Sequence, residues 1–102
     1  MNPIKHKFKA KPQNVDGIHF ASKKESQHYG LLKKLVDLGE VLFFLRQVPL
    51  HLPGNIKYIC DFVVFWENGE VTFEEVKGFK TGLYKAKKKM IEAKYPIEII
   101  EI

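Results

Sequence analysis

Residues 58–77 read YICDFVVFWENGEVTFEEVK, which is two apolar runs separated by Glu-Asn-Gly at 67–69. Runs rich in Val, Ile, Phe and Tyr on either side of Asn-Gly are the strongest short-range sequence signal for a β-hairpin. The sequence therefore predicts antiparallel strands at 58–66 and 71–76. The polar residues within these two runs are expected to lie on a sheet.

The length of the hairpin loop decides which side chains face each other. In a three-residue loop at 67–69, with its glycine in the left-handed conformation, Asp61 lies directly across from Glu75. In a two-residue turn, Asp61 would pair with Val76, and the two carboxylates would point to opposite faces. We favour the three-residue loop. It puts Asp61, Glu75 and, two residues further on, Lys77 on one face.

The rest of the chain predicts an α/β fold with a mixed four-stranded sheet flanked by two helices. A capping-box pattern, Ser-x-x-Glu at 22–25, and a glycine stop at residue 39 delimit the first helix. The expected order is helix 23–38, strands 41–50, 58–66 and 71–76, helix 83–95 and strand 97–102. Leu83, Ala86, Met90 and Ala93 are expected to form the buried stripe of the second helix.

The 102 residues allow one domain, expected at 15–102 after a flexible basic arm at 1–14. A net charge of +5 and an isoelectric point near 9.3 favour a polyanionic partner such as nucleic acid. The single cysteine, Cys60, excludes an internal disulfide, and no apolar run suits a membrane span or signal peptide. A cytoplasmic location without membrane contact is expected.

Basic side chains gather in three places that could contact DNA phosphates. They are the arm, the start of the first helix, and the loop and helix that follow the hairpin. The residues expected to bind DNA are Lys5, Lys7, Lys23, Lys24, Lys80, Lys85 and Lys88.

Two carboxylates that face each other on a sheet repel unless a positive charge lies between them. Oxygen ligands of this kind suit Mg²⁺ or Mn²⁺, which are bound through one or two carboxylates and substrate phosphate. Lys77 on the same face could orient a water molecule or stabilise negative charge on a phosphate. The combination suits phosphodiester hydrolysis. A zinc site is disfavoured, because the four histidines show no ligand spacing.

Two further polar residues have alternative interpretations. Glu25 either completes the capping box or supplies a third carboxylate at the polar end of the hairpin, and the sequence pattern alone favours the cap. Gln47 lies among apolar neighbours, so its amide either meets polar partners on a packed face or faces solvent.

Asp61, followed after thirteen residues by Glu75-Val76-Lys77, resembles the D…(D/E)-x-K signature of the PD-(D/E)XK nuclease superfamily. The expected αβββαβ order resembles the core of that restriction-endonuclease-like fold. Residues 15–25 are similar to the opening of a small phage-encoded family of the superfamily, labelled as of unknown function. One departure from the name-giving pattern is that Cys60, rather than proline, precedes the aspartate.

The resemblance implies a role for each matching residue. Asp61 and Glu75 would bind Mg²⁺ together with the Val76 backbone carbonyl, and Lys77 would be the catalytic lysine. Glu25 would be the helix carboxylate of the site, and Gln47 would support it.

The expected function is that of a Mg²⁺-dependent DNA endonuclease that acts on branched DNA in phage replication or recombination. A chain this short has little room for sequence readout, so shape selection, a homodimer or a partner protein would supply specificity. The alternatives are a catalytically silent DNA-binding module of the same fold and a phage protein that binds a host protein.

Overall fold

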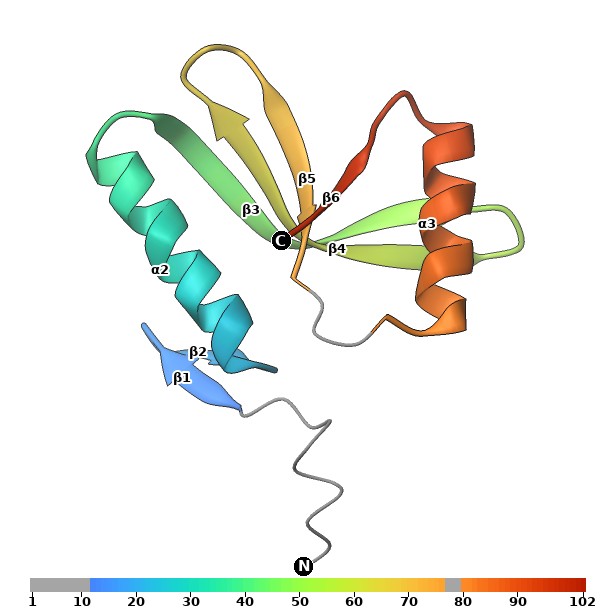
Figure 1. The fold of residues 1–102 in the computed structure, drawn as a ribbon, viewed down its shortest axis with the longest axis horizontal. Helices are drawn as coiled ribbons and strands as arrows, with labels where there is room; N and C mark the ends of the chain where they lie inside the picture. Colours follow the sequence, from blue (N-terminus) through green and yellow to red (C-terminus); the bar gives the residue numbers. More distant parts are fainter. Residues whose placement is uncertain (1–11, 77–79) are drawn as a thin grey trace, which may run out of the picture.

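The computed structural model describes residues 12–76 and 80–102. Within these ranges the chain forms two small strands, a helix, three longer strands, a second helix and a final short strand (Figure 1). Their bounds are β1 Gln13–Val15, β2 Ile18–Phe20, α2 Lys23–Asp37, β3 Val41–Leu52, β4 Ile56–Trp66, β5 Val71–Glu75, α3 Gly82–Lys94 and β6 Ile99–Glu101.

The main sheet has the strand order β3-β4-β5-β6. The pairs β3–β4 and β4–β5 are antiparallel, and β6 pairs with β5 in parallel after the α3 crossover. This confirms a mixed α/β arrangement of four strands and two helices. β3 is an edge strand, which explains why Pro49 is tolerated within it.

The loop between β4 and β5 has three residues, as predicted. The Trp66 amide donates to the Glu70 carbonyl at 2.9 Å, and the Gly69 amide donates to the Trp66 carbonyl at 3.0 Å. Gly69 has a φ of 94°, a conformation that strongly favours glycine. Because Phe62 then pairs with Glu74, Asp61 stands at the level of Glu75.

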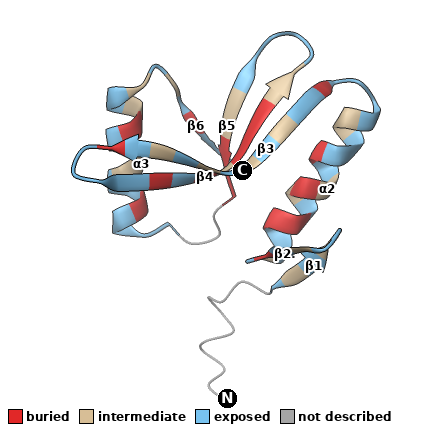
Figure 2. Cartoon of the chain, turned by 180° about the vertical axis from the view of Figure 1, so that it is seen from behind, coloured by how far each residue is buried: buried red, intermediate tan, exposed pale blue. Residues whose placement is uncertain are grey.

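Two apolar clusters hold the fold together, one beneath each helix. The α2 cluster includes Leu32 and Phe62, and the α3 cluster includes Cys60 and Ile91. Figure 2 shows buried segments in both helices and in the middle of the sheet, whereas the far end of the β3–β4 hairpin is largely exposed. β4 contributes to both clusters: Cys60 and Val63 belong to the α3 cluster, whereas Phe62 and Val64 belong to the α2 cluster.

The buried face of α3 differs from the prediction. Leu83 is 67% exposed and Met90 is 39% exposed, whereas Tyr84 and Ile91 are buried. The predicted stripe was therefore wrong by about one residue. The reason is tertiary: the Tyr84 ring packs near Tyr58 and its hydroxyl reaches Glu101, so the helix turns this side to the sheet.

The N-terminal segment begins with a small hairpin. β1 pairs with β2 across Asp16-Gly17, so regular structure starts at Gln13, inside the arm predicted for 1–14. Residues 1–11 of the predicted arm, with Lys5 and Lys7, lie outside the described residues. Neither described helix is long and apolar enough to span a lipid bilayer.

Candidate functional site

One polar residue from each strand of the main sheet stands at the same level. These residues are Gln47 on β3, Asp61 on β4, Glu75 on β5 and Glu101 on β6. The ladder pairs that fix this level are Arg46–Phe62, Val48–Cys60, Phe62–Glu74 and Glu75–Glu101. Val63 and Phe73 pair two residues further along the hairpin, within its apolar run, so that run ends close to the candidate site.

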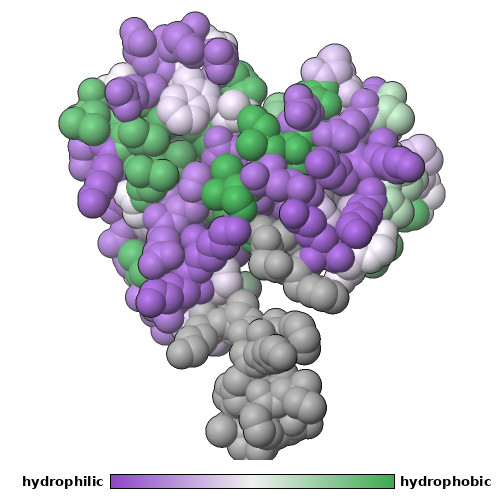
Figure 3. Space-filling model, in the orientation of Figure 1, coloured by the Kyte–Doolittle hydropathy of each residue, from purple (hydrophilic) through white to green (hydrophobic). Residues whose placement is uncertain are grey.

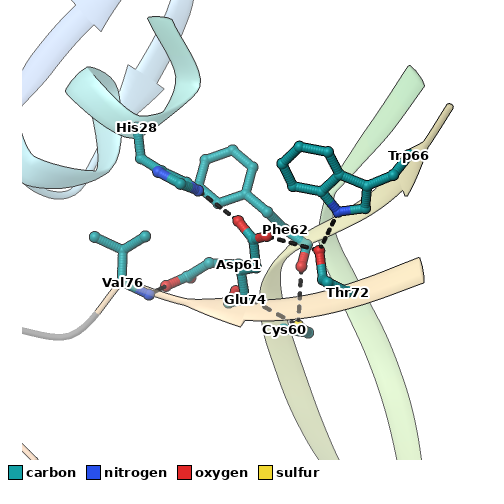
Figure 4. A network of polar contacts seen from close by, with 8 residues as sticks. All are labelled: His28, Cys60, Asp61, Phe62, Trp66, Thr72, Glu74 and Val76. Atoms are coloured by element: carbon teal, nitrogen blue, oxygen red, sulfur yellow. Dashed lines mark hydrogen bonds and ion pairs between the residues drawn. The ribbon is translucent and has the colours of Figure 1, made fainter. Parts of the chain in front are cut away.

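Asp61 is held by the two strands beside it. Its Oδ2 atom accepts a hydrogen bond of 2.9 Å from the Val76 amide, and Oδ1 accepts one of 3.2 Å from Nε2 of Gln47 (Figure 4 shows the Val76 contact). The Asp61 carboxylate therefore accepts from a backbone amide just after β5, in place of a backbone carbonyl of the neighbouring strand. Both contacts fix the direction in which the side chain points.

Gln47 links Asp61 to helix α2. Its Nε2 atom also donates to Oε2 of Glu25 at 3.1 Å, so one amide joins two carboxylates. Gln47 has a φ of 52° and leaves the regular ladder at this position. A non-glycine residue in the left-handed region is uncommon, and such residues concentrate at functional sites.

Glu25 contributes its backbone amide to the helix cap, whereas its side chain does not close a capping box. The Ser22 hydroxyl accepts a hydrogen bond of 3.1 Å from the Glu25 amide, which confirms the helix cap. The Glu25 carboxylate, however, points to the sheet, where it meets Gln47 and, at 3.6 Å, Nη2 of Arg46. Burial and then the nearby charge of Asp61 raise the pKa of Glu25, and Arg46 opposes this shift.

Glu75 has a different partner. Its side chain is 1% exposed and accepts a hydrogen bond from the Tyr58 hydroxyl within the α3 cluster. Burial, followed by this contact, raises the pKa of Tyr58. Burial also raises the pKa of the neighbouring Cys60 thiol to about 12, which keeps that thiol neutral and unreactive.

Glu74 forms a buried network that was not predicted from the sequence. Its carboxylate contacts Nε2 of His28 at 2.6 Å and accepts a hydrogen bond of 2.7 Å from Thr72, which in turn accepts from the Trp66 indole at 2.8 Å (Figure 4). Strand alternation already placed Glu74 on the face opposite Glu75. Its fixed partner is His28 of α2, one helical turn after Glu25, so the network fastens that helix to β5.

The described donors fit a hard cation in chemical type. Asp61 and Glu25 offer carboxylate oxygens joined through Gln47, and Mg²⁺ commonly uses one or two carboxylates with water and phosphate. Within residues 12–76 and 80–102, no three His, Cys, Asp or Glu side chains lie close enough to hold a metal together. The approach of Glu75 and the Val76 carbonyl to the same ion stays a prediction. Lys77 lies outside the described residues.

The described lysines predicted to contact DNA fall into two groups. Lys23 and Lys24 are exposed at the start of α2, and Lys24 donates to the Ile102 carbonyl at 2.7 Å. The second group lies around Glu101 on β6, a carboxylate that was not predicted from the sequence, and its members are Lys80, Lys85 and Lys88. Pairing the last strand in parallel with β5 puts Glu101 beside Glu75, and this register is the signal that could have identified Glu101.

Comparison with known proteins places the chain in a family without assigning an activity. No curated protein matches it. A family model does match, and it covers nearly all of the chain, including every described residue of the polar level except Glu101. The chain belongs to the family described as "Protein of unknown function (DUF1064)", whose model matches residues 5–100.

Proposed function

We propose that the protein is a Mg²⁺- or Mn²⁺-dependent endonuclease with a restriction-endonuclease-like fold, which hydrolyses phosphodiester bonds of DNA. The observation that carries this proposal is the alignment of Asp61 and Glu75 on neighbouring strands, with Glu25 joined to Asp61 through Gln47. The carboxylates of Asp61 and Glu25, which are distant in sequence, thus meet through Gln47 at the level of Glu75 in the sheet. The αβββαβ order of α2 to β6 supports the same fold assignment.

The residues divide into ligands and supports. Asp61 and Glu25 would hold the metal, with Glu75 and the Val76 carbonyl contributed by β5. A bound divalent ion would polarise the phosphate and make a water molecule more acidic. Gln47 and Arg46 orient Glu25, while the Val76 amide orients Asp61. Lys77, two residues after Glu75 in the sequence, would stabilise the negative charge that develops on the phosphate.

DNA is the substrate that the charge of the chain supports. The net charge of +5 and the lysines on both helices suit a phosphate backbone. The described domain has no separate module for reading base edges, so selection by DNA shape, as at a branch in phage replication or recombination, fits its size. A homodimer would bring two such sites to the two strands.

The proposal is tested by incubating supercoiled plasmid, single-stranded DNA and a four-way junction with protein and either Mg²⁺ or Mn²⁺. Asp61→Asn and Lys77→Ala should abolish cleavage, whereas Asp37→Asn and Lys34→Ala, which change exposed residues of α2, should not. Mn²⁺ should also raise the melting temperature of the wild type but not that of Asp61→Asn. Cleavage that survives both site substitutions would refute the assignment.

A silent DNA-binding module is the second candidate, and one observation favours it. Glu75 is buried against Tyr58, while Asp61 is joined to Glu25. If this separation persists when metal is present, the site lacks one of its carboxylates. The module predicts tight DNA binding that chelation of metal leaves unchanged, with no strand cut under any of the conditions above.

A further inference from the structure

A hollow of about 630 Å³ lies between α3 and the end of β6. Its basic lining is Lys80, Lys85, Lys88 and Lys89, and its acidic lining is Glu101. Hydrophilic side chains dominate the surface over α3 in Figure 3. The hollow is open to solvent on the surface that carries the second group of lysines.

Three donors converge on the Glu101 carboxylate. The Tyr84 hydroxyl donates to Oε2 at 2.8 Å, and Lys80 and Lys88 lie 3.2 and 3.7 Å from Oε1 and Oε2. The Tyr84 hydrogen bond and then the lysines hold the pKa of Glu101 below its ordinary value, so the group is an anion at neutral pH. A compact oxyanion is thus bound by a hydroxyl and two ammonium groups, which is a donor set that also suits phosphate.

The hollow holds more positive charge than Glu101 can balance. Four lysines against one carboxylate leave three positive charges, and Lys85 and Lys89 form no ion pair with another described residue. Lysines this close together repel one another, and an anion with several charges would relieve that repulsion. The unbalanced charge therefore points to a polyanion rather than to a single small anion.

We propose that this hollow binds consecutive phosphates of a DNA strand, and that Glu101 occupies one of the phosphate positions in the free protein. The identity of the polyanion as DNA rests on the proposed function, whereas the anion site rests on the contacts above. Glu101 pairs with Glu75 in the parallel ladder. A strand bound in the hollow would therefore lead directly to the candidate metal site.

The test measures binding alone, by fluorescence anisotropy of a short labelled oligonucleotide, single-stranded or duplex, in EDTA at several salt concentrations. Glu101→Gln should tighten binding by about threefold to tenfold, because it removes the competing anion. Glu98→Gln is the matched control, since it removes the same charge from an exposed residue nearby. It should change affinity by less than about twofold.

Substituting the lysines of the hollow should have the opposite effect on DNA affinity. Lys80→Ala and Lys88→Ala should each weaken binding by about threefold to tenfold and lower the salt slope by about 0.9 for a duplex, whereas Lys34→Ala on α2 should do neither. Thermal melting of each variant checks that it is folded. Equal affinities for Glu101→Gln and Glu98→Gln, or for the hollow lysines and Lys34→Ala, would overturn the proposal.

Because the experiment contains no metal, its result is separate from that of the cleavage assay. A protein that cuts no DNA but shows these affinity changes retains the anion site and loses the nuclease assignment. If cleavage depends on Asp61 but the DNA affinity does not change when Glu101 or the hollow lysines are substituted, the nuclease assignment stands and the anion site is refuted.

Discussion

Replacing Gln47 by methionine should destabilise the protein by removing the donor shared between two carboxylates. Methionine keeps the length and lack of branching of glutamine, so packing and the backbone cost at a φ of 52° stay nearly the same. What changes is the pair of hydrogen bonds at 3.1 Å to Glu25 and 3.2 Å to Asp61. The substitution therefore isolates the polar link between α2 and the sheet.

The size of the effect follows from the exposure of each contact. Gln47 is exposed, so water can replace its amide at Asp61, and that bond contributes about 0.5 kcal/mol. The Glu25 carboxylate is only 6% exposed, so losing its donor costs more, about 1–1.5 kcal/mol. We expect a total loss of about 1.5–2 kcal/mol in the free energy of unfolding at neutral pH.

The effect should depend on pH in a definite direction. The folded-state pKa of Glu25 lies above its ordinary value of 4.5, so the stability that its neutral form provides is fully present below 4.5 and is lost as the pH rises through the folded pKa. The Gln47 hydrogen bond lowers that pKa, and its removal raises it further. The difference between variant and wild type should therefore be largest at neutral pH and shrink on acidification.

Urea unfolding followed by circular dichroism, across a pH series, measures this difference. Gln27→Met is the matched control, because Gln27 is exposed on α2, and it should be within about 0.5 kcal/mol of wild type. A loss for Gln47→Met that equals the control, or one that does not change with pH, would refute the link between Gln47 and the charge of Glu25.

Three further comparisons of variants test neighbouring parts of the structure. Glu25→Gln should stabilise the protein at neutral pH and lose that advantage as the pH falls through the raised pKa of Glu25 to 4.5, in urea unfolding with exposed Glu40→Gln as the control. Ile91→Ala should cost about 2–5 kcal/mol of unfolding free energy, whereas Met90→Ala should cost less than about 1 kcal/mol; similar losses at both positions would contradict the observed face of α3. Gly30→Ala, in the middle of α2 with open space at the added Cβ, should raise stability by about 0.5–1 kcal/mol, whereas Gly69→Ala should lower it by about 1 kcal/mol because of its φ of 94°. Thermal melting of the two variants against wild type would show whether their signs are opposite.

The hairpin was predictable from sequence because its determinants are local. Asn68-Gly69 sets the loop, and the alternation of apolar residues sets the register that aligns Asp61 with Glu75. The helix cap at Ser22 is local in the same sense. These predictions were confirmed because the residues that determine them lie close together in the sequence.

The direction of long polar side chains was not predictable in this way. Glu25 satisfies a capping pattern in sequence, yet its carboxylate reaches Gln47, which is 22 residues away. Glu75 stands at the level of Asp61 as expected, and its carboxylate accepts a hydrogen bond from the Tyr58 hydroxyl, 17 residues away. A glutamate with several rotatable bonds takes the donor that the tertiary fold provides, and the spacing of charges along the chain does not contain that information.

The candidate site lies where the sheet cannot remain regular. Cys60 and Phe62 are two residues apart, so an ideal strand would turn them to the same face, yet they belong to clusters under different helices. The change of face must occur at Asp61, and there the ladder omits the pair with Gln47, which adopts a left-handed φ. Because regular strand pairing is missing at this position, side chains bind the polar groups there. Asp61 accepts a hydrogen bond from the Val76 amide, and Gln47 donates one to Glu25. The bend that lets one hairpin serve two cores is thus also what gathers carboxylates at its centre, which is why substitutions at Gln47 should affect the stability of the fold and the geometry of the site together.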